Sequence, residues 1–278
     1  MPELPEVECL AQALRKKIIG AKVQGIKFWR RDLREPLPQA AMRAAVCGKR
    51  LEQVERRAKY LLLTTGSGSG LLVHLGMSGN LFLTSQAQPC APHAHVCIEL
   101  ETHAGKKNYL QYVDPRRFGR MAAFQPPATE HAFLRKLGVE PLQQTRLAHY
   151  LWRKSRGKRQ AIKNYLMDNQ VVVGIGNIYA CEALYAARLH PLLPAMAVSL
   201  VSFQRLARSC RTVLKRAIAA GGTSFRDYRH LEGGQGYFAV SLAVYSKQGQ
   251  PCPTCNTPIA VCRIAGRSTF YCPSCQVL

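Results

Sequence analysis

Residues 252–275 read CPTCNTPIAVCRIAGRSTFYCPSC, and the paired cysteines in this stretch decide the fold of the C-terminal end. Two C-x2-C pairs stand sixteen residues apart: Cys252, Cys255, Cys272 and Cys275. Four thiolates at this spacing fill the tetrahedral shell of one Zn²⁺ and leave no open position, so the metal is predicted to be structural. The β-prone runs TPIAVCRI and RSTFY predict a hairpin with Gly266 and Arg267 at its tip. We therefore predict a zinc ribbon over residues 236–278 that holds Arg267 rigidly.

The remaining cysteines do not suggest a disulfide framework. They are odd in number and scattered, often among apolar neighbours: Cys9, Cys47, Cys90, Cys97, Cys181, Cys210 and Cys262. This pattern is typical of reduced thiols in a cytosolic protein. Cys262 lies in the middle of a predicted strand, where we expect it to pack rather than to bind the metal.

Upstream of the ribbon, the sequence pattern predicts first strands and then helices. Short β-prone runs separated by turn signals fill residues 21–125 and predict a sandwich or barrel: KVQGIKFW, YLLLTT, GLLVHLGM, NLFLT, HVCIEL, NYLQYV and RMAAF. Helical runs follow: HAFLRKLG, TRLAHYLWRK, AIKNYLMDN, NIYACEALYAARL and SLVSFQRLARSCRTVLKRAIAAG. The predicted fold is therefore α+β with three domains, at residues 1–125, 126–235 and 236–278. No apolar run reaches the roughly 20 residues of a spanning helix, which predicts a cytoplasmic protein without a membrane partner.

The charge points to a polyanionic partner. Lys and Arg number 39 against 16 acidic residues, giving a net charge of +23. Cations placed on phosphates release condensed counterions, so a surplus of this size favours nucleic acid. A merely basic protein without such a partner has the same composition.

The N-terminus, MPELPEVECLAQALRKKIIG, predicts both a helix and an unusual amine. Apolar residues from Val7 to Ile18 recur at helical spacing, acidic residues occupy the first turn, and Gly20 ends the helix. Removal of Met1 would expose Pro2 as a secondary amine with a reference pKa of roughly 7.7–8.0, which suits Schiff-base chemistry. Glu3 beside it could move protons. Ordinary helix capping explains the same residues.

The chain as a whole resembles the bacterial formamidopyrimidine-DNA glycosylases, which are bifunctional enzymes of base-excision repair. The resemblance covers nearly the whole chain and rests on these strings in the family's order: MPELPEVE, RRAKYLLL, HLGMSG, DPRRFG, LMDNQVVVGIGNIYACEAL, GYFAV and RSTFYCPSC. It implies an N-terminal β-sandwich with an N-terminal helix, a helix–two-turns–helix segment, and a zinc ribbon. It also implies a DNA glycosylase and abasic-site lyase, monomeric, that acts on double-stranded DNA with oxidised bases or abasic sites.

By this resemblance, Pro2 is the nucleophile and Glu3 its acid–base partner, while Glu6 orders the site or stabilises the helix start. Lys59 serves in β-elimination and contacts phosphate; Arg267 serves in δ-elimination and grips the phosphate beside the lesion. Without the family, Lys59 reads as a solvated lysine at a strand end.

Further residues match DNA-contacting positions. Everting a base costs a few kcal/mol, and the family fills the gap with a Met–Arg–Phe trio, here Met77, Arg116 and Phe118. Apolar wedges of this kind are typical of bent-DNA binding, although Met77 and Phe118 also read as core residues. The other matches to DNA contacts are His74, His93, Lys158, Lys163, Asn177 and Tyr237. Residues 221–238, GGTSFRDYRHLEGGQGYF, resemble the loop that closes over 8-oxoguanine.

Two alternatives stay open at this point. One is the related endonuclease VIII-like activity on oxidised pyrimidines, although that branch has glycine where this chain has Leu4 and lacks the Met–Arg–Phe trio. The other is a non-catalytic protein that binds damaged DNA, which would need neither Pro2, Glu3 nor Lys59.

Overall fold

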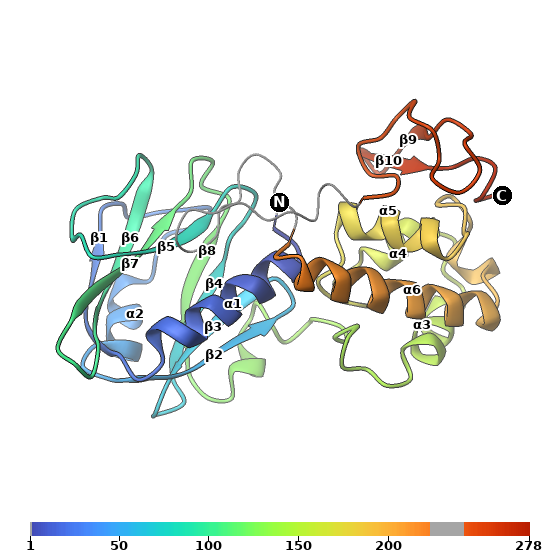
Figure 1. Ribbon diagram of the computed structural model, residues 1–278. Coiled ribbons are helices and arrows are strands. Elements are labelled where there is room, and N and C mark those ends of the chain that lie inside the picture. Colours follow the sequence, from blue (N-terminus) through green and yellow to red (C-terminus); the bar gives the residue numbers. More distant parts are fainter. Residues whose placement is uncertain (1, 223–241) are drawn as a thin grey trace. The chain divides into compact units, whose positions relative to one another are not determined.

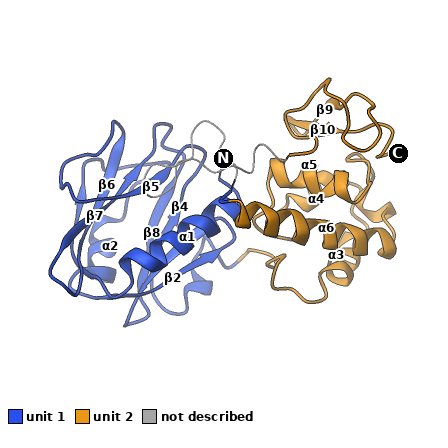
Figure 2. Ribbon diagram, in the orientation of Figure 1, with its two compact units in different colours: residues 1–135, 221–237 blue, residues 136–220, 238–278 orange. Residues whose placement is uncertain are grey.

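The structure is a computed structural model that describes residues 2–222 and 242–278. The chain divides into two compact units (Figure 2). Unit 1 comprises residues 1–135 and 221–237, and unit 2 comprises residues 136–220 and 238–278. Across the described residues, no helix combines the length and the apolar character needed to cross a bilayer.

Unit 1 is built on two four-stranded antiparallel sheets (Figure 1). The first has the order β1 (Lys22–Phe28), β6 (Ala94–Glu101), β7 (Lys107–Val113), β5 (Asn80–Thr84), and the second the order β2 (Leu51–Arg57), β3 (Tyr60–Thr65), β4 (Gly70–His74), β8 (Arg120–Phe124). Residues of both sheets, such as Ile26 and Ile98 from one and Leu63 and Val73 from the other, meet in one hydrophobic core. The predicted β-sandwich is confirmed.

Helix α1 (Leu4–Ile18) packs its apolar stripe into this core and runs along β2. Glu3 is its N-cap, and Glu3 and Glu6 form a reciprocal capping box, which satisfies backbone N–H groups that the first turn leaves without partners. The chain leaves the helix through Gly20, whose φ is +81°. The helix expected from the sequence is therefore present.

Two elements of unit 1 were not predicted. Helix α2 (Gln39–Val46) is short, and only its Met42, Ala45 and Val46 are buried. Strand β2 offers just two buried apolar residues, Leu51 and Val54, because a register shift after Leu51 breaks the alternation. Neither element has enough periodicity to be recognised in isolation.

Unit 2 contains four helices among its described residues: α3 (Leu147–Ser155), α4 (Ile162–Leu166), α5 (Asn177–Ala186) and α6 (Leu200–Ala219). The turns of residues 167–176 join α4 to α5. Short 3-10 helices occur at η1 (Ala128–Glu130) in unit 1 and η2 (Ala195–Ala197) in unit 2. The four predicted helical runs that match α3 to α6 are confirmed.

The helix expected over HAFLRKLG is wrong, because residues 131–136 form turns. Directly after them, the Gly138 N–H donates to the carbonyl of Asn169, and Val139 forms a parallel bridge with Val172. A Cβ on Gly138 would lie 2.2 Å from the carbonyl oxygen of Val171. The chain is therefore drawn into extended pairing where the local pattern suggested a helix.

The C-terminal ribbon consists of β9 (Ala260–Ile264) and β10 (Arg267–Tyr271), which pair antiparallel beside α5 (Figure 1). Ile264 pairs with Arg267, so the turn contains only Ala265 and Gly266. Both have positive φ, 47° and 76°, as expected for a two-residue turn that matches strand twist. The predicted hairpin with Arg267 at its tip is confirmed.

Candidate active site

The N-terminal end of α1 carries the residues expected to do the chemistry. Pro2 is buried, and Glu3 and Glu6 are each 2 % exposed. The Glu3 N–H donates to Oε2 of Glu6 at 2.8 Å. A Cβ on Gly222, where φ is +83°, would come within 3.3 Å of the Glu6 side chain, so the backbone of the chain approaches this carboxyl closely. Glu3 and Glu6 therefore do cap the helix, and this contact fixes the Glu3 side chain next to Pro2.

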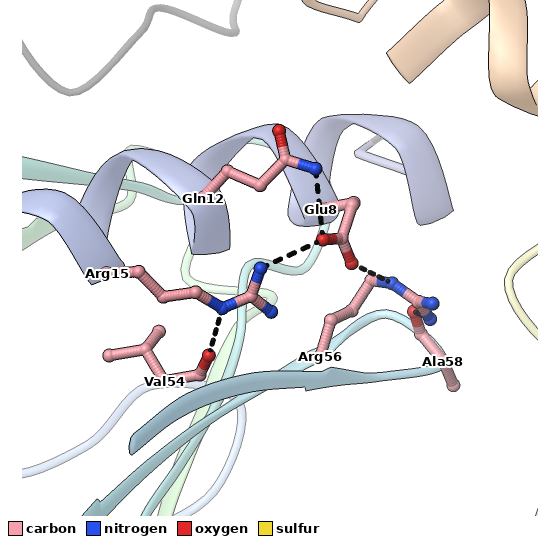
Figure 3. A network of polar contacts seen from close by, with 6 residues as sticks. All are labelled: Glu8, Gln12, Arg15, Val54, Arg56 and Ala58. Carbon is pink, nitrogen blue, oxygen red and sulfur yellow. Dashed lines mark hydrogen bonds and ion pairs between the residues drawn. The ribbon is translucent and has the colours of Figure 1, made fainter. Parts of the chain in front are cut away.

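A partly buried ion-pair network ties α1 to the β2–β3 hairpin (Figure 3). Glu8 accepts from Arg56 Nε at 2.9 Å and from Arg15 Nη1 at 3.2 Å. Burial alone would raise the pKa of Glu8, but the hydrogen bond and charge of Arg56, with the charge of Arg15, hold it below its ordinary value. Arg56 also donates to the carbonyl of Ala58 at 3.1 Å. The network thus fixes the hairpin turn relative to the helix that begins after Pro2.

Lys59 occupies that turn, next to Ala58, whose φ is +56°. Its side chain is only 7 % exposed, so it is not the solvated strand-end lysine that its surroundings in the sequence suggest. Its charge acts on His74 at the end of β4: burial first, then Lys59 and Arg120, lower the pKa of His74 to about 4. The Gly76 N–H donates to His74 Nδ1 at 3.0 Å. His74 is therefore a neutral imidazole beside a buried cation.

The loops HLGMSG and DPRRFG are joined through Asp114, which is fully buried. Its Oδ1 accepts from the Ser78 hydroxyl at 2.6 Å, and its Oδ2 accepts from the Gly119 N–H at 2.8 Å and the Tyr112 hydroxyl at 3.2 Å. The Arg116 N–H in turn donates to Ser78 Oγ at 3.2 Å. One carboxyl thus holds both loops.

The trio carried by these loops faces outward. Met77 is 37 % and Phe118 42 % exposed, so neither is a core residue. The Arg116 guanidinium lies over the Phe118 ring, 4.9 Å from its centre. Gly76, at φ +64°, permits the approach of the loops, since a Cβ there would lie 2.4 Å from the Phe118 backbone. Two exposed apolar side chains and a cation are thereby displayed on a rigid double loop.

The four ribbon cysteines fit a single zinc ion. Their sulfur atoms all lie within 4.8 Å of one another, with separations of 3.4 Å (Cys255–Cys272), 3.5 Å (Cys255–Cys275) and 3.9 Å (Cys252–Cys275). Zn–S bonds of about 2.3 Å in a tetrahedron require sulfur separations of about 3.8 Å. Backbone N–H groups of Thr254 and Cys275 point to the sulfurs of Cys252 and Cys272, each at 3.4 Å. The donor set leaves no position for a substrate, so the zinc is structural, and Arg267 extends from the hairpin it stabilises with its side chain exposed.

Lys163 and Asn177 hold this hairpin from the helical side. Lys163 is fully buried, and its Nζ donates to Asn177 Oδ1 at 2.5 Å and to Thr269 Oγ1 at 2.6 Å. Asn177 is the first residue of α5, after the N-cap Gly176, and its Nδ2 donates to the carbonyl of Ser268 at 2.9 Å. Both side chains therefore hydrogen-bond to β10 at Ser268 and Thr269, immediately after Arg267.

The carbonyl of His93 accepts from the Asp114 N–H at 3.0 Å, so His93 borders the double loop, whereas Lys158 belongs to unit 2. Lys158 is exposed in the turn after α3, and His93 is exposed, with a φ of +66°, just before β6. Tyr237 and residues 223–238 of the loop expected to close over the base lie outside the described residues.

Comparison with known proteins agrees with this arrangement. Family models match residues 1–121 (formamidopyrimidine-DNA glycosylase N-terminal domain), 137–229 (formamidopyrimidine-DNA glycosylase H2TH domain) and 249–277 (zinc finger found in FPG and IleRS). Formamidopyrimidine-DNA glycosylases of Vibrio cholerae and Alkalilimnicola ehrlichii are 44% and 45% identical to the chain, over 99% of it and 100% of theirs. The chain belongs to the formamidopyrimidine-DNA glycosylase family.

Solved structures of the formamidopyrimidine-DNA glycosylase family have the same fold. A Lactococcus lactis enzyme variant in complex with DNA containing Fapy-dG superposes with a TM-score of 0.90 at 32% identity, covering 100% of both chains. The MutM (Fpg) protein of Thermus thermophilus gives 0.87 at 35% identity, covering 99% of this chain and 98% of that one.

Two carboxyls in this family member were missed from its sequence. Asp114 begins a motif that was recognised, but its own role needed the partner loop to be known. Glu182 is 6 % exposed on α5 and accepts from the N–H groups of Ala243, Val244 and Tyr245 at 2.8–2.9 Å. A single acidic residue within the apolar run NIYACEALYA was the available signal, since buried charges are almost always hydrogen-bonded.

Proposed function

We propose that this protein is a DNA glycosylase and abasic-site lyase that removes oxidised purines, such as 8-oxoguanine and formamidopyrimidines, from double-stranded DNA. The observation that carries the proposal is the burial of Pro2 and Glu3 together at the start of α1, in a chain whose relatives at 44–45% identity are formamidopyrimidine-DNA glycosylases over their full length. A non-catalytic DNA-binding protein has no need for a buried proline amine next to a carboxyl.

The proposed chemistry begins when Met1 is removed and the Pro2 nitrogen attacks the anomeric carbon of the damaged nucleotide. The base leaves with a proton and the amine loses its own proton; the C1′–O4′ bond of the sugar then breaks, its oxygen takes up a proton, and the resulting charged iminium acts as an electron sink for elimination. Glu3 is placed to transfer protons. Loss of the 3′ phosphate and then of the 5′ phosphate completes β- and δ-elimination, with Lys59 serving the first and Arg267 the second.

Substrate binding is assigned to the exposed trio and to four further residues that match DNA contacts of the family. Met77 and Phe118 wedge the duplex, and Arg116 faces the base left without its partner, because apolar insertion at a kinked step offsets lost stacking. His74, His93, Lys158 and Tyr237 contact the DNA strands. For Lys163 and Asn177, the hydrogen bonds to β10 support a positioning role, in which they orient the backbone beside Arg267 for its phosphate contact.

Three further assignments belong to the proposal. The functional domains are residues 1–125 for catalysis, 126–235 for the helix–two-turns–helix segment and 236–278 for the ribbon. The protein acts as a monomer. It works in the bacterial cytoplasm on the chromosome; the relatives are bacterial.

The test compares lesions and termini. Wild-type protein should release 8-oxoguanine opposite cytosine faster than thymine glycol; the reverse order would assign it to the endonuclease VIII-like activity. A two-residue extension before Pro2 should abolish base release, because it converts the amine into an amide, whereas the same extension after Leu278 should not. Normal base release by the N-terminally extended protein would refute the proposal.

A further inference from the structure

The surface formed by α3 and α6 in unit 2 is strongly cationic. Two hollows of about 690 Å³ and 470 Å³ lie on it and share Arg146 and His149 in their walls. We define the α3–α6 surface by six cations that line these hollows: Arg146, Arg153, Lys154, Arg208, Arg211 and Lys215. Among the described residues that line the two hollows, none is acidic.

Carboxylates of the described residues do not neutralise these cations. Within residues 136–222 the only acids are Glu140, Asp168 and Glu182, and Glu140 and Glu182 are buried. None of the six cations takes part in an ion pair with a described carboxylate. Arg211 alone is partly occupied, since it donates to the carbonyls of Pro141 and Gln144. The charge therefore remains available to a ligand.

The arrangement along α6 is costly to the helix and matches a polyanion. Arg208, Arg211 and Lys215 follow one another at spacings of three and four residues, so they form one stripe on the helix. Like charges at these spacings destabilise a helix. The stripe extends for roughly 10 Å at 1.5 Å per residue, which corresponds to about three phosphates at 3.4 Å of axial rise per strand. Arginine also matches phosphate with paired N–H donors.

This surface is distinct from the ribbon side of unit 2. The ribbon packs on α5 through β10, whereas α3 packs on α6 (Figure 1). Arg267, Lys163 and Asn177 all belong to the ribbon side. The contacts that hold a ligand at Arg267 therefore do not involve the α3–α6 surface, which stays accessible to a second ligand.

We propose that the α3–α6 surface binds the phosphate backbone of a second segment of duplex DNA. Its chemistry favours a polyanion over an acidic protein, because protein interfaces depend on buried aromatic and aliphatic anchors. The large exposed apolar side chains of unit 2 do not line the hollows; they are Leu192, Met196, Val201, Val277 and Leu278. Such binding holds undamaged DNA without sequence preference and goes beyond the proposed lesion chemistry.

The test measures binding to an undamaged 60-bp duplex as a function of salt. The variant Arg146→Gln/Arg208→Gln/Lys215→Gln removes three exposed cations and spares Arg211, which holds backbone. If each contacts one phosphate, the slope of log K against log salt should shrink by about 2.7, at roughly 0.9 per contact. The matched control, Lys16→Gln/Lys106→Gln/Lys107→Gln, removes three exposed charges in unit 1, where α1 ends and the β6–β7 turn lies, and should leave most of the slope intact.

A second arm separates this surface from the lesion site. Wild-type protein saturated with a short lesion duplex should still capture a labelled undamaged 30-bp duplex, and the triple variant should not, although both release the damaged base from the short duplex equally. Equal slopes for the two triple variants, or no capture by the saturated wild type, would overturn the proposal. Preferred capture of single-stranded DNA or RNA would overturn the assignment to duplex. The salt measurement needs no lesion, so it stands whether or not base release is observed.

Discussion

Asp114 should be the residue on which the outward-facing trio depends most. It accepts three hydrogen bonds inside the protein, from Ser78, Gly119 and Tyr112. Asp114→Ala leaves the Gly119 N–H and the Tyr112 hydroxyl buried without this acceptor, at about 1–3 kcal/mol for each group, so we expect a loss of about 3–5 kcal/mol. Asp114→Asn keeps an oxygen that can accept from the Gly119 N–H and the Tyr112 hydroxyl, and its amide can donate to Ser78 Oγ. The expected loss of stability is therefore only about 1–2 kcal/mol.

Urea unfolding at pH 7 measures these values, and the protein should remain folded at 25 °C because domains are stable by about 5–15 kcal/mol. The control is Asp32→Ala, which removes a half-exposed carboxylate paired with Arg30 and Arg117 and should cost less than about 1 kcal/mol. Under conditions where it is folded, Asp114→Ala should also release 8-oxoguanine at least about tenfold more slowly, corresponding to 1.4 kcal/mol. An Asp114→Ala protein as stable as Asp32→Ala, with normal base release, would refute the positioning role.

The other predictions concern pH, the hairpin arginine and the metal. His74 has a pKa of about 4 in the folded protein against 6.5 when unfolded, so the unfolded chain binds the proton first as the pH falls. The free energy of unfolding should therefore fall by about 2 kcal/mol between pH 7 and pH 5. In urea unfolding at these two pH values, His74→Gln should lose this part of the pH dependence, and a pH dependence equal to that of the wild type would contradict the prediction. Arg267→Ala should weaken DNA binding and leave products of β-elimination alone on sequencing gels, with zinc retained; Arg263→Ala, on the neighbouring strand, is the control, and loss of zinc from Arg267→Ala would show the role to be structural. Cys272→Ser should lose both its zinc, as measured by atomic absorption, and the DNA binding that Arg267 provides, whereas Cys262→Ser should keep both. Zinc retained by Cys272→Ser would count against the four-cysteine site.

Much of this fold could be predicted because its signals are local. The apolar stripe and acidic first turn of α1 lie within one helix, and the paired cysteines and two-residue turn of the ribbon lie within residues 252–275. Where several short-range signals agree, propensity and tertiary structure coincide. Strand β2 was missed because its signal is not local: Leu51 and Val54 are recognisable as strand residues only once their pairing with β3 is known.

The candidate site was harder to predict because its contacts join distant segments. The sequence identifies Lys163 as a cation, but its burial depends on β10, more than a hundred residues later. Asp114 likewise depends on Ser78 and Gly119 together. From the sequence alone Lys59 is interpreted as a solvated lysine at a strand end, because the contacts by which Glu8 and Arg56 fix its hairpin against α1 are not visible there. Chemistry-bearing residues were recognised from motifs, whereas the residues that position them required three-dimensional contacts.

The proposed chemistry depends on attack of the Pro2 secondary amine on the sugar of the damaged nucleotide. Borohydride reduction during turnover of an 8-oxoguanine duplex, followed by peptide mapping with mass spectrometry, tests it most directly. We expect a covalent adduct on Pro2, in a peptide that has lost Met1. An adduct on Lys59 or on any other residue, or efficient trapping by protein that still carries Met1, would contradict it.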